Sequence, residues 1–413
     1  MCIDLKSFYA SVECAERGLD PMRARLVVAD AERTDKTICL AVSPALKAMG
    51  IRNRCRVFEI PPSVDYIMAT PRMHRYLEYS ARIYGIYLKY LSKDDIHVYS
   101  VDEAFLDVTH YLRMYHMSAR ELAIRIMGDI VATTGIPATC GIGTNLYLTK
   151  IALDITAKHA PDRIGILDEP RYRSSMWDHL PLTDFWRIGR GTASHLARYG
   201  LHTMRDVAFA DEDLLYREFG VDAELLIDHA WGREPTTIAD IKRYSPQNRS
   251  LTSGQVLPRD YNTEEGLLLC KEMADLLCLD LSEAGLVTDS ITLAVGYSRD
   301  AGGGMTNGTI SLGRQTCLER HILPRVEELY RRVAVPERPI RRLGLCLNRV
   351  ELEGFTQYSL LDDPVQLEKD RTLQQTVAGL RRKYGRSAVI RGMNLEEAGR
   401  TLERNGQIGG HRA

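Results

Sequence analysis

The chain has 413 residues, of which 45% are hydrophobic and 26% charged, and its formal net charge is −1. At about 150 residues per domain, this length predicts two to four domains of ordinary globular composition. No apolar run reaches the roughly 18 residues of a membrane span, and no signal-peptide pattern opens the chain. The near-zero net charge neither supports nor excludes a nucleic-acid partner, because only local basic clusters matter for phosphate contact.

Nine cysteines are scattered along the chain, and no Cys-x-x-Cys pair occurs among them. An odd number without such pairs argues against a disulfide framework and against a zinc site. We therefore expect free thiols and a cytoplasmic protein.

The first 170 residues alternate between strand-like and helix-like segments, which is typical of an α/β domain. Ser118 and Glu121 form a capping box at the start of one expected helix. Gly141-Ile142-Gly143 is not a dinucleotide site, because Leu146 stands where a third glycine would be needed. The expected strands lie at 25–30, 37–42, 96–109 and 138–142, and the expected helices at 45–49, 74–91, 118–135 and 145–158.

The rest of the chain changes character twice. Short helical segments run from 167 to 231, and the periodicity is then lost over 232–245, where Pro235 and several basic residues indicate a linker. A small α+β domain follows, and after it an amphipathic helix that ends before Gly385. The α+β domain has expected strands at 250–256, 290–297, 308–315 and 340–352 and expected helices at 263–283 and 317–332.

Two adjacent acids, Asp102 and Glu103, interrupt an otherwise strand-like apolar stretch. Neighbouring side chains of an ideal strand point to opposite faces, so both acids can serve one site only if the chain reverses there. A strand, a tight reversal and a second strand would achieve this. A hard divalent cation such as Mg²⁺ could then neutralise the pair. The alternative, that the pair is ordinary exposed turn chemistry, stays open at this point.

A third acid, Asp4, ends a short apolar strand in the opening Asp-Leu-Lys-Ser-Phe-Tyr-Ala-Ser-Val-Glu. This stretch resembles the N-terminal signature of Y-family DNA polymerases, and Ser100-Val101-Asp102-Glu103 resembles their second acidic signature. The resemblance extends from residue 1 to about 350, and the remaining tail is similar to the bacterial UmuC-type branch. The strand before Asp4 is shorter than is usual for the family, so we expect that a few residues are missing before it.

The resemblance implies a multidomain α/β and α+β right-hand polymerase with palm, fingers, helical thumb and little finger. The implied domains are the palm at 1–9 and 74–166, the fingers at 10–73, the thumb at 167–232, a linker at 233–245, the little finger at 246–350 and a C-terminal tail at 351–413.

The resemblance also implies an active site. Asp4, Asp102 and Glu103 would be the catalytic metal ligands for two Mg²⁺ ions, with the Leu5 carbonyl as an extra ligand. Tyr9, next to Phe8, would be the steric gate against a ribose hydroxyl. The alternative is that Tyr9 is only a core aromatic at the start of a helix. Lys47 and Lys158 would contact the triphosphate of the incoming nucleotide, although a lone helical lysine is usually just solvated. Three residues depart from the family pattern, namely Lys6, Ala41 and Pro44.

Three further segments imply macromolecular partners, namely 188–196, the basic segment 242–249 and 357–361. Residues 188–196 resemble a helix-hairpin-helix, whose glycines let backbone N–H groups meet a DNA phosphate. The 357–361 stretch resembles the peptide that bacterial polymerases insert into the β sliding clamp, and accessory mutasome proteins are possible partners as well. The expected DNA-binding residues are Gly189, Arg190, Gly191, Lys242, Arg243 and Arg249, and the expected clamp-binding residues are Gln357, Leu360 and Leu361.

The resulting hypothesis is a low-fidelity, template-directed translesion DNA polymerase of the bacterial DNA damage response, associated with the nucleoid. It would transfer a nucleotide from a dNTP to a primer 3′-hydroxyl. One alternative is a catalytically silent Y-family scaffold of a mutasome, but such relatives lose the acids that this chain retains. Another is a nucleotide cyclase, which would want a Gly-Gly-Asp/Glu-Glu-Phe turn where this chain has Ser-Val-Asp-Glu-Ala.

Overall fold

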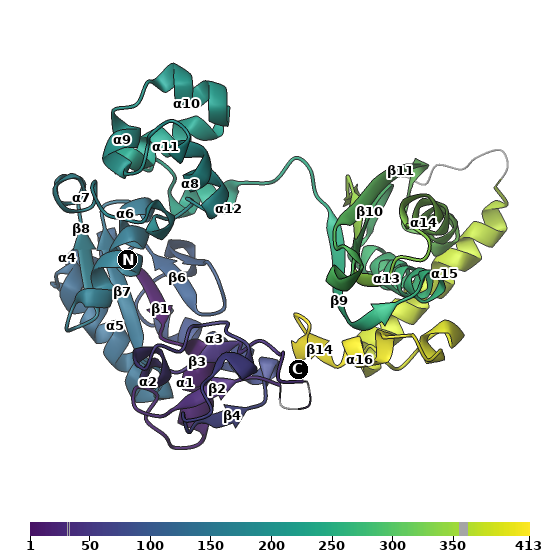
Figure 1. Ribbon diagram of the computed structural model, residues 1–413, viewed down its shortest axis with the longest axis horizontal. Coiled ribbons are helices and arrows are strands. Elements are labelled where there is room, and N and C mark those ends of the chain that lie inside the picture. The colour runs from purple at the N-terminus through teal and green to yellow at the C-terminus, as the bar shows by residue number, and fades with distance from the viewer. Residues whose placement is uncertain (31, 33, 355–361) are drawn as a thin grey trace. The chain divides into compact units, whose positions relative to one another are not determined.

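The computed structural model describes the chain from Met1 to Ala413 apart from residues 31, 33 and 355–361 (Figure 1). The chain divides into two units, one comprising 1–244 with 412–413 and the other comprising 245–411. Within the described ranges, no helix is long and apolar enough to cross a membrane.

The first unit is built on a five-stranded sheet whose central strand, β1 (Cys2–Leu5), comes from the very start of the chain. This strand runs antiparallel to both of its neighbours. Cys2, Ile3 and Leu5 are buried, which explains why so short a strand is almost wholly apolar. The strand order is β5 (Ile96–Val98), β6 (Glu103–Leu106), β1, β7 (Ala138–Gly143) and β8 (Ile164–Leu167).

Helices α3 (Met73–Tyr87) and α5 (Ala119–Thr134) pack against each other, and α5 contacts β7. The expected capping box is confirmed, since the Ser118 side chain accepts a hydrogen bond from the backbone N–H of Glu121 and the Glu121 carboxylate accepts one from the N–H of Ser118. The short helix α4 (Thr109–Tyr115) connects β6 to this layer.

A smaller sheet lies beside the first. Its strand order is β3 (Ala41–Val42), β2 (Leu26–Val28) and β4 (Ile67–Ala69). Helices α1 (Phe8–Glu16) and α2 (Pro44–Ala48) belong to the same part of the chain, and α1 contacts both β2 and β3.

The helix expected over 145–158 is not regular. It begins as α6 (Leu146–Ile151), continues as a π-helical turn η3 (Ala152–Thr156) and ends as a 3₁₀ turn η4 (Ala157–His159). A π turn inside a helix re-aims the side chains that follow it and is frequent at functional sites.

Close glycine contacts accompany this irregular helix. A Cβ atom added to Gly141 of β7 would lie 2.2 Å from the carbonyl oxygen of Thr149, and one added to Gly165 of β8 would lie 2.2 Å from that of Ala152. Gly143 is equally crowded, with the backbone nitrogen of Thr149 at 2.4 Å. The Gly-Ile-Gly segment therefore serves direct packing of helix backbone on strand backbone.

The expected helical region after β8 is confirmed, and a buried aromatic and aliphatic core that includes Trp177, Phe185 and Leu196 holds it together. Its helices are α7 (Glu169–Ser175), α8 (Arg190–Ala197), α9 (Met204–Ala208), α10 (Glu212–Phe219) and α11 (Asp222–Ala230).

The loss of periodicity over 232–245 does not mean that the segment lacks structure. It contains α12 (Ile238–Arg243), which starts with a capping box of Thr237 and Asp240. Ile238 packs in one cluster with Cys2, Phe105 and Leu153 of the first unit. A six-residue helix is too short to produce a visible apolar period, so the sequence pattern did not indicate it, and the linker assignment stays a prediction.

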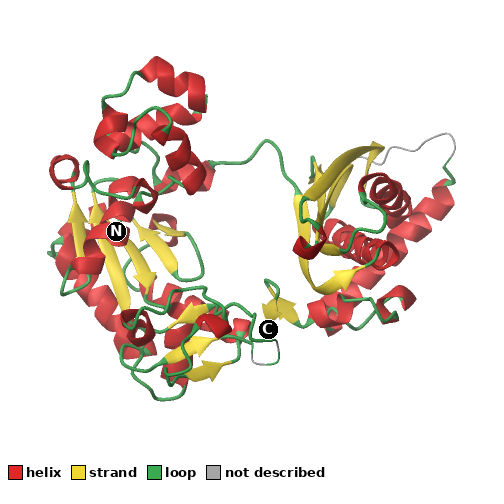
Figure 2. Cartoon of the chain, viewed as in Figure 1, coloured by secondary structure: helices red, strands yellow, loops and turns green. Residues whose placement is uncertain are grey.

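The second unit is built on a five-stranded antiparallel sheet with helices over one face (Figure 2). The strand order is β11 (Met305–Thr316), β10 (Leu286–Tyr297), β12 (Ile340–Asn348) and β9 (Leu251–Tyr261), and β13 (Glu351–Leu352) pairs with β10. Helices α13 (Thr263–Ala284) and α14 (Glu319–Val333) contact this sheet. The four expected strands and two expected helices of this α+β part are thereby confirmed.

The described part of the C-terminal tail is folded onto α13. Helix α15 (Pro364–Tyr384) packs along α13, and the chain then forms η7 (Gly392–Leu395), α16 (Thr401–Asn405) and the short strands β14 (Gln407–Ile408) and β15 (His411–Arg412). The buried carboxylate of Glu272 accepts hydrogen bonds from the Asn394 side chain and from the backbone N–H groups of Arg400 and Thr401.

Gln374 of α15 ties three helices together. Its amide nitrogen donates to the carbonyls of Cys278 and Cys317, both at 2.8 Å, and its oxygen accepts from the backbone N–H of Glu319 at 3.3 Å. We expect Gln374→Leu to destabilise the second unit by about 2–4 kcal/mol, because three buried polar groups lose their partner.

Gln375→Leu makes the same chemical change one residue further along, at an exposed position, and should shift stability by less than about 0.5 kcal/mol. Hydrogen–deuterium exchange of the α15 amides measures both effects. Equal protection in the two variants would contradict the role given to Gln374.

Candidate active site

The two acidic motifs meet in the sheet. In the β1–β6 pair Asp4 lies directly opposite Glu103, and the backbone N–H of Leu5 donates to the carbonyl of Asp102 at 2.9 Å. The expected reversal between β5 and β6 is present, because the N–H groups of Tyr99 and Ser100 both donate to the carbonyl of Glu103. Residues about a hundred positions apart thus bring three carboxylates to one end of the central strand.

The side chains of the acidic doublet have different partners. Ser100 Oγ donates to Asp102 Oδ1 at 2.7 Å. Glu103 Oε1 lies 2.7 Å from the Lys150 ammonium and accepts from the Cys2 thiol at 3.0 Å. Within the described part of the chain, no three His, Cys, Asp or Glu side chains form a ready metal cage.

The surroundings of the Asp4 carboxylate disfavour its ionised form. Burial, followed by the charges of Asp102 and Glu103, raises its pKa from 3.8 to about 7, and Lys150 opposes this shift. A divalent cation would relieve such repulsion, and carboxylate and carbonyl oxygens are the ligands that Mg²⁺ takes. The residues present at the site therefore fit the metal that the family implies.

Positive side chains surround the same carboxylate. The pKa of Lys47 is lowered by burial and by the charges of Lys6 and Lys158, while Asp4 raises it. The pKa of Lys6 is also lowered, by burial first and then by Arg163. The structure therefore brings the two predicted phosphate-binding lysines within reach of each other's charge, and Lys47 within reach of that of Asp4.

Lys6, which departs from the family pattern, contributes to the positive charge near Asp4. Its charge acts on Asp4 and Lys158, so it adds a cation to the same group. Lys47 itself is held by a hydrogen bond from its ammonium to Ser7 Oγ at 2.8 Å.

Tyr9 is half-buried, whereas the neighbouring Phe8 is buried. The pKa of the Tyr9 hydroxyl is raised by burial and then by the Asp102 charge, while Arg54 lowers it, so the ring lies near the acids. Phe8 is only 3% exposed, and its ring centroid is 5.7 Å from that of Tyr9. The Phe8 side chain is thus part of the core and supports its neighbour, and its contact with a nucleotide stays a prediction.

The glycines of the expected helix-hairpin-helix do not make its turn. Gly189 has φ −83° at the start of α8, whereas the left-handed residue before it is Arg187, with φ 70°. A Cβ atom on Gly189 or Gly191 would meet nothing within 4 Å. These glycines leave the start of α8 uncovered rather than permit a strained turn, and Arg190 beside them is exposed.

The basic residues expected at the DNA interface are divided between the two units. The Lys242 ammonium donates to the carbonyl of Lys93, and Arg243 pairs with Asp240 of the same helix. Arg249 belongs to the second unit, where its guanidinium donates to Ser245 Oγ at 3.2 Å. The predicted clamp-binding residues Gln357, Leu360 and Leu361 lie outside the described residues.

Lys150 is a residue of this site that the sequence motifs did not indicate. This lysine is 7% exposed, on the side of α6 that packs on the sheet, and it pairs with Asp154 at 3.2 Å as well as with Glu103. Burial alone would lower the pKa of Lys150, but Asp154 and Glu103 raise it. The available signal was a lysine on the buried face of an expected helix, four residues before an aspartate.

This fold and this site define a right-hand polymerase. Residues 3–154 match the model of the impB/mucB/samB family, and residues 248–360 match that of the C-terminal domain of the same family. The chain therefore belongs to this family, which comprises the UmuC- and DinB-type Y-family DNA polymerases, as the motifs predicted.

Two relatives from Bacillus subtilis (strain 168) are each 30% identical to the chain. UvrX, which is named for UV-damage repair, aligns over 100% of this chain and 97% of its own length, and DNA polymerase IV 2 aligns over 99% and 97%. DNA polymerase IV 2 of Halalkalibacterium halodurans is 28% identical over 99% of this chain and 98% of its own length. The UmuC-type branch stays a prediction.

Among solved structures, a Y-family DNA polymerase chimera of Dbh and Dpo4 has a similar fold. It superposes with a TM-score of 0.67 at 21% sequence identity, and the match covers 85% of this chain and 98% of the chimera. The predicted class of fold is thereby confirmed.

The raised pKa of Asp4 yields a prediction about stability. Because the folded state binds this proton more tightly than the unfolded state, the free energy of unfolding falls as pH rises from about 4 to about 7. Asp4→Asn removes this loss, so at pH 8 without divalent cations the variant should be more stable than the natural protein, by at most about 4 kcal/mol at about 1.36 kcal/mol per pKa unit.

Thermal unfolding followed by tryptophan fluorescence measures the effect, since all three tryptophans lie in the first unit. Added Mg²⁺ should stabilise the natural protein and leave the variant nearly unchanged. Asp65→Asn, at an exposed position, is the control. A variant at position 4 that is less stable than the natural protein at pH 8 would contradict the electrostatic assignment.

Proposed function

We propose that the chain is a template-directed, low-fidelity DNA polymerase that synthesises past damaged bases. One observation carries this proposal: Asp4 lies opposite Glu103 in the sheet, with Asp102 adjoining and with Lys47 and Lys6 close enough to feel the charge of Asp4, while Lys158 is close enough to act on both lysines. Membership of the Y family and relatives named DNA polymerase IV support the same reaction.

The proposed reaction is the attack of a primer 3′-hydroxyl on the α-phosphorus of a dNTP, with release of pyrophosphate. Two bound Mg²⁺ ions would supply charge neutralisation and an acidified hydroxyl. Asp4, Asp102, Glu103 and the Leu5 carbonyl would hold these ions, and the lysine group would bind the triphosphate. Phosphoryl transfer depends mainly on positioning and on electrostatic stabilisation, so these groups are chemically sufficient.

Lys150 has a defined place in this proposal. It pairs with Glu103 at 2.7 Å, so it compensates one of the three negative charges before any cation binds. A cation at the site would share the Glu103 carboxylate with this ammonium, so Lys150 would tune how readily the site accepts metal.

Asp102→Ala should lower primer extension by about a hundredfold or more while duplex binding stays close to that of the natural protein. The substitution removes a proposed metal ligand, and electrostatic groups at reacting centres commonly have effects of this size. Asp107→Ala changes an acid near the far end of β6 and is the matched control. Full extension activity in the Asp102 variant would refute its role as a metal ligand, whereas no extension by the natural protein would favour the catalytically silent scaffold.

Tyr9 is proposed to read the sugar of the incoming nucleotide. A ring fixed at the nucleotide site excludes a ribose hydroxyl by collision, which is discrimination against the wrong ligand. We expect Tyr9→Ala to raise ribonucleotide insertion relative to deoxyribonucleotide insertion by about tenfold or more. The measurement is the ratio of kcat/KM for a dNTP to that for the matched rNTP, and an unchanged ratio would refute the assignment.

The proposal includes DNA and clamp partners. The uncovered start of α8 and the exposed Arg190 suit contact with a DNA backbone, whose affinity would fall steeply with added salt. The clamp partner rests on the sequence alone, where a glutamine and two leucines can fill a small apolar pocket.

A further inference from the structure

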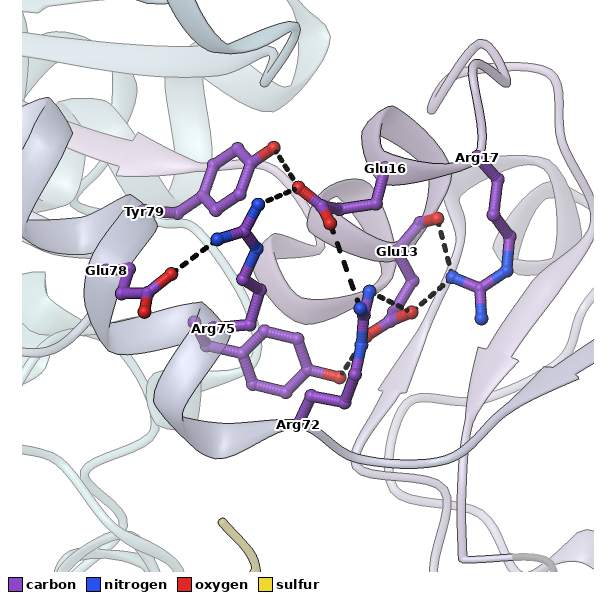
Figure 3. Close-up of polar contacts among 8 residues, drawn as sticks. Glu13, Glu16, Arg17, Arg72, Arg75, Glu78 and Tyr79 are labelled. Atoms are coloured by element: carbon purple, nitrogen blue, oxygen red, sulfur yellow. Dashed lines mark hydrogen bonds and ion pairs between the residues drawn. The ribbon is translucent and has the colours of Figure 1, made fainter.

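A buried carboxylate lies behind the proposed sugar-reading residue. Glu13 is one helical turn after Tyr9 on α1 and is fully buried. It accepts two hydrogen bonds from the Arg72 guanidinium, each 2.9 Å long, and one from the Tyr76 hydroxyl at 2.9 Å. Arg17 also pairs with it (Figure 3).

These contacts keep Glu13 ionised. Burial raises the pKa of its carboxyl, but hydrogen bonds from Arg72, Arg17 and Tyr76 outweigh burial and lower it overall. A buried charge with all of its partners in place is a rigid element, because removal of any one partner leaves the others uncompensated.

A second acid extends the network outward between α1 and α3. Glu16 pairs with Arg75 at 2.8 Å and accepts from the Tyr79 hydroxyl at 2.7 Å, and Arg72 reaches it at 3.8 Å (Figure 3). Arg75 in turn pairs with the exposed Glu78 at 2.6 Å. The network therefore runs from the protein interior to the surface and fixes α3 against α1.

Tyr76 connects the network to the site. Its side chain is fully buried, its hydroxyl is bound to Glu13, and its ring stacks on that of Tyr9 with a centroid distance of 4.4 Å and an interplanar angle of 15°. One face of the Tyr9 ring thus rests on an aromatic plane that is itself anchored at its far end.

We propose that Tyr76, anchored by Glu13, is a positioning residue that determines how strictly the site rejects ribonucleotides. Rejection by collision works only if the colliding ring cannot yield. A ring backed by a stacked aromatic with a fixed hydroxyl is held in place, whereas a ring without this backing can turn aside and admit the larger sugar. The inference rests on the proposed role of Tyr9.

The test uses the ratio of kcat/KM for a dNTP to that for the matched rNTP on one primer-template. Both substrates are measured on the same preparation, so the ratio is insensitive to the fraction of folded protein. Tyr76→Leu removes the stacked ring and should lower the ratio by about three- to tenfold, the range that an aromatic pair can supply. Tyr76→Phe keeps the ring but removes the hydroxyl that binds Glu13, and it should lower the ratio by about twofold.

Glu78→Gln is the matched control, because this exposed acid on the same helix pairs with Arg75 alone among the residues shown in Figure 3. It should leave the ratio unchanged. Glu13→Gln should fall between the two Tyr76 variants, because the amide keeps the shape of the carboxylate and loses its charge.

A double variant separates positioning from general damage to the fold. In a Tyr9→Ala background, Tyr76→Leu should have no further effect on the ratio, since no ring remains to be held. A further loss of the same size as in the natural background would overturn the proposal. The proposal would also be overturned if Tyr76→Leu and Tyr76→Phe both kept the ratio of the natural protein while Tyr9→Ala alone abolished discrimination. That outcome would leave the role of Tyr9 intact.

If Tyr9→Ala itself keeps the natural ratio, then the role of Tyr9 and the role of Tyr76 both fail. The polymerase assignment is judged independently, by primer extension with Asp102→Ala.

Discussion

Mutual repulsion among three carboxylates is the constraint around which the first unit is organised. Asp4 and Glu103 are placed opposite each other by strand register, and Asp102 follows from the reversal that precedes β6. A protein can hold such a cluster only if surrounding groups compensate it. Here the compensation is a buried lysine on one side and a group of partly buried cations on the other.

The compensating lysine depends on how α6 is seated. Gly141 and Gly165 are paired across β7 and β8, and together with Gly143 they allow the helix backbone to lie almost directly on the strands. This close approach, followed by a π turn, brings Lys150 to Glu103 and keeps Asp154 within reach of it. Three residues without side chains are thus part of the electrostatics of the site.

Much of the site could be predicted from the sequence, because its acids lie in contiguous motifs whose spacing reflects a hairpin and a central strand. The same holds for the α+β unit, where long elements show clear periodicity. Lys150 could not be predicted, since its partner is chosen by the packing of a helix on a sheet. The structure of α12 escaped detection because six residues do not display a period. The anchoring of Tyr76 was equally hidden, as a tyrosine stripe on a helix usually indicates packing alone.

The way the C-terminal tail is folded limits how the second unit can be cut or extended. Glu272 has no counterion in its own helix and depends on N–H groups supplied more than a hundred residues later. A chain shortened before Asn394 would lose all three of these hydrogen bonds and remove the segment that packs over this carboxylate. The last fifty residues are therefore a structural layer of the domain, and fusion partners are better tolerated after this layer than within it.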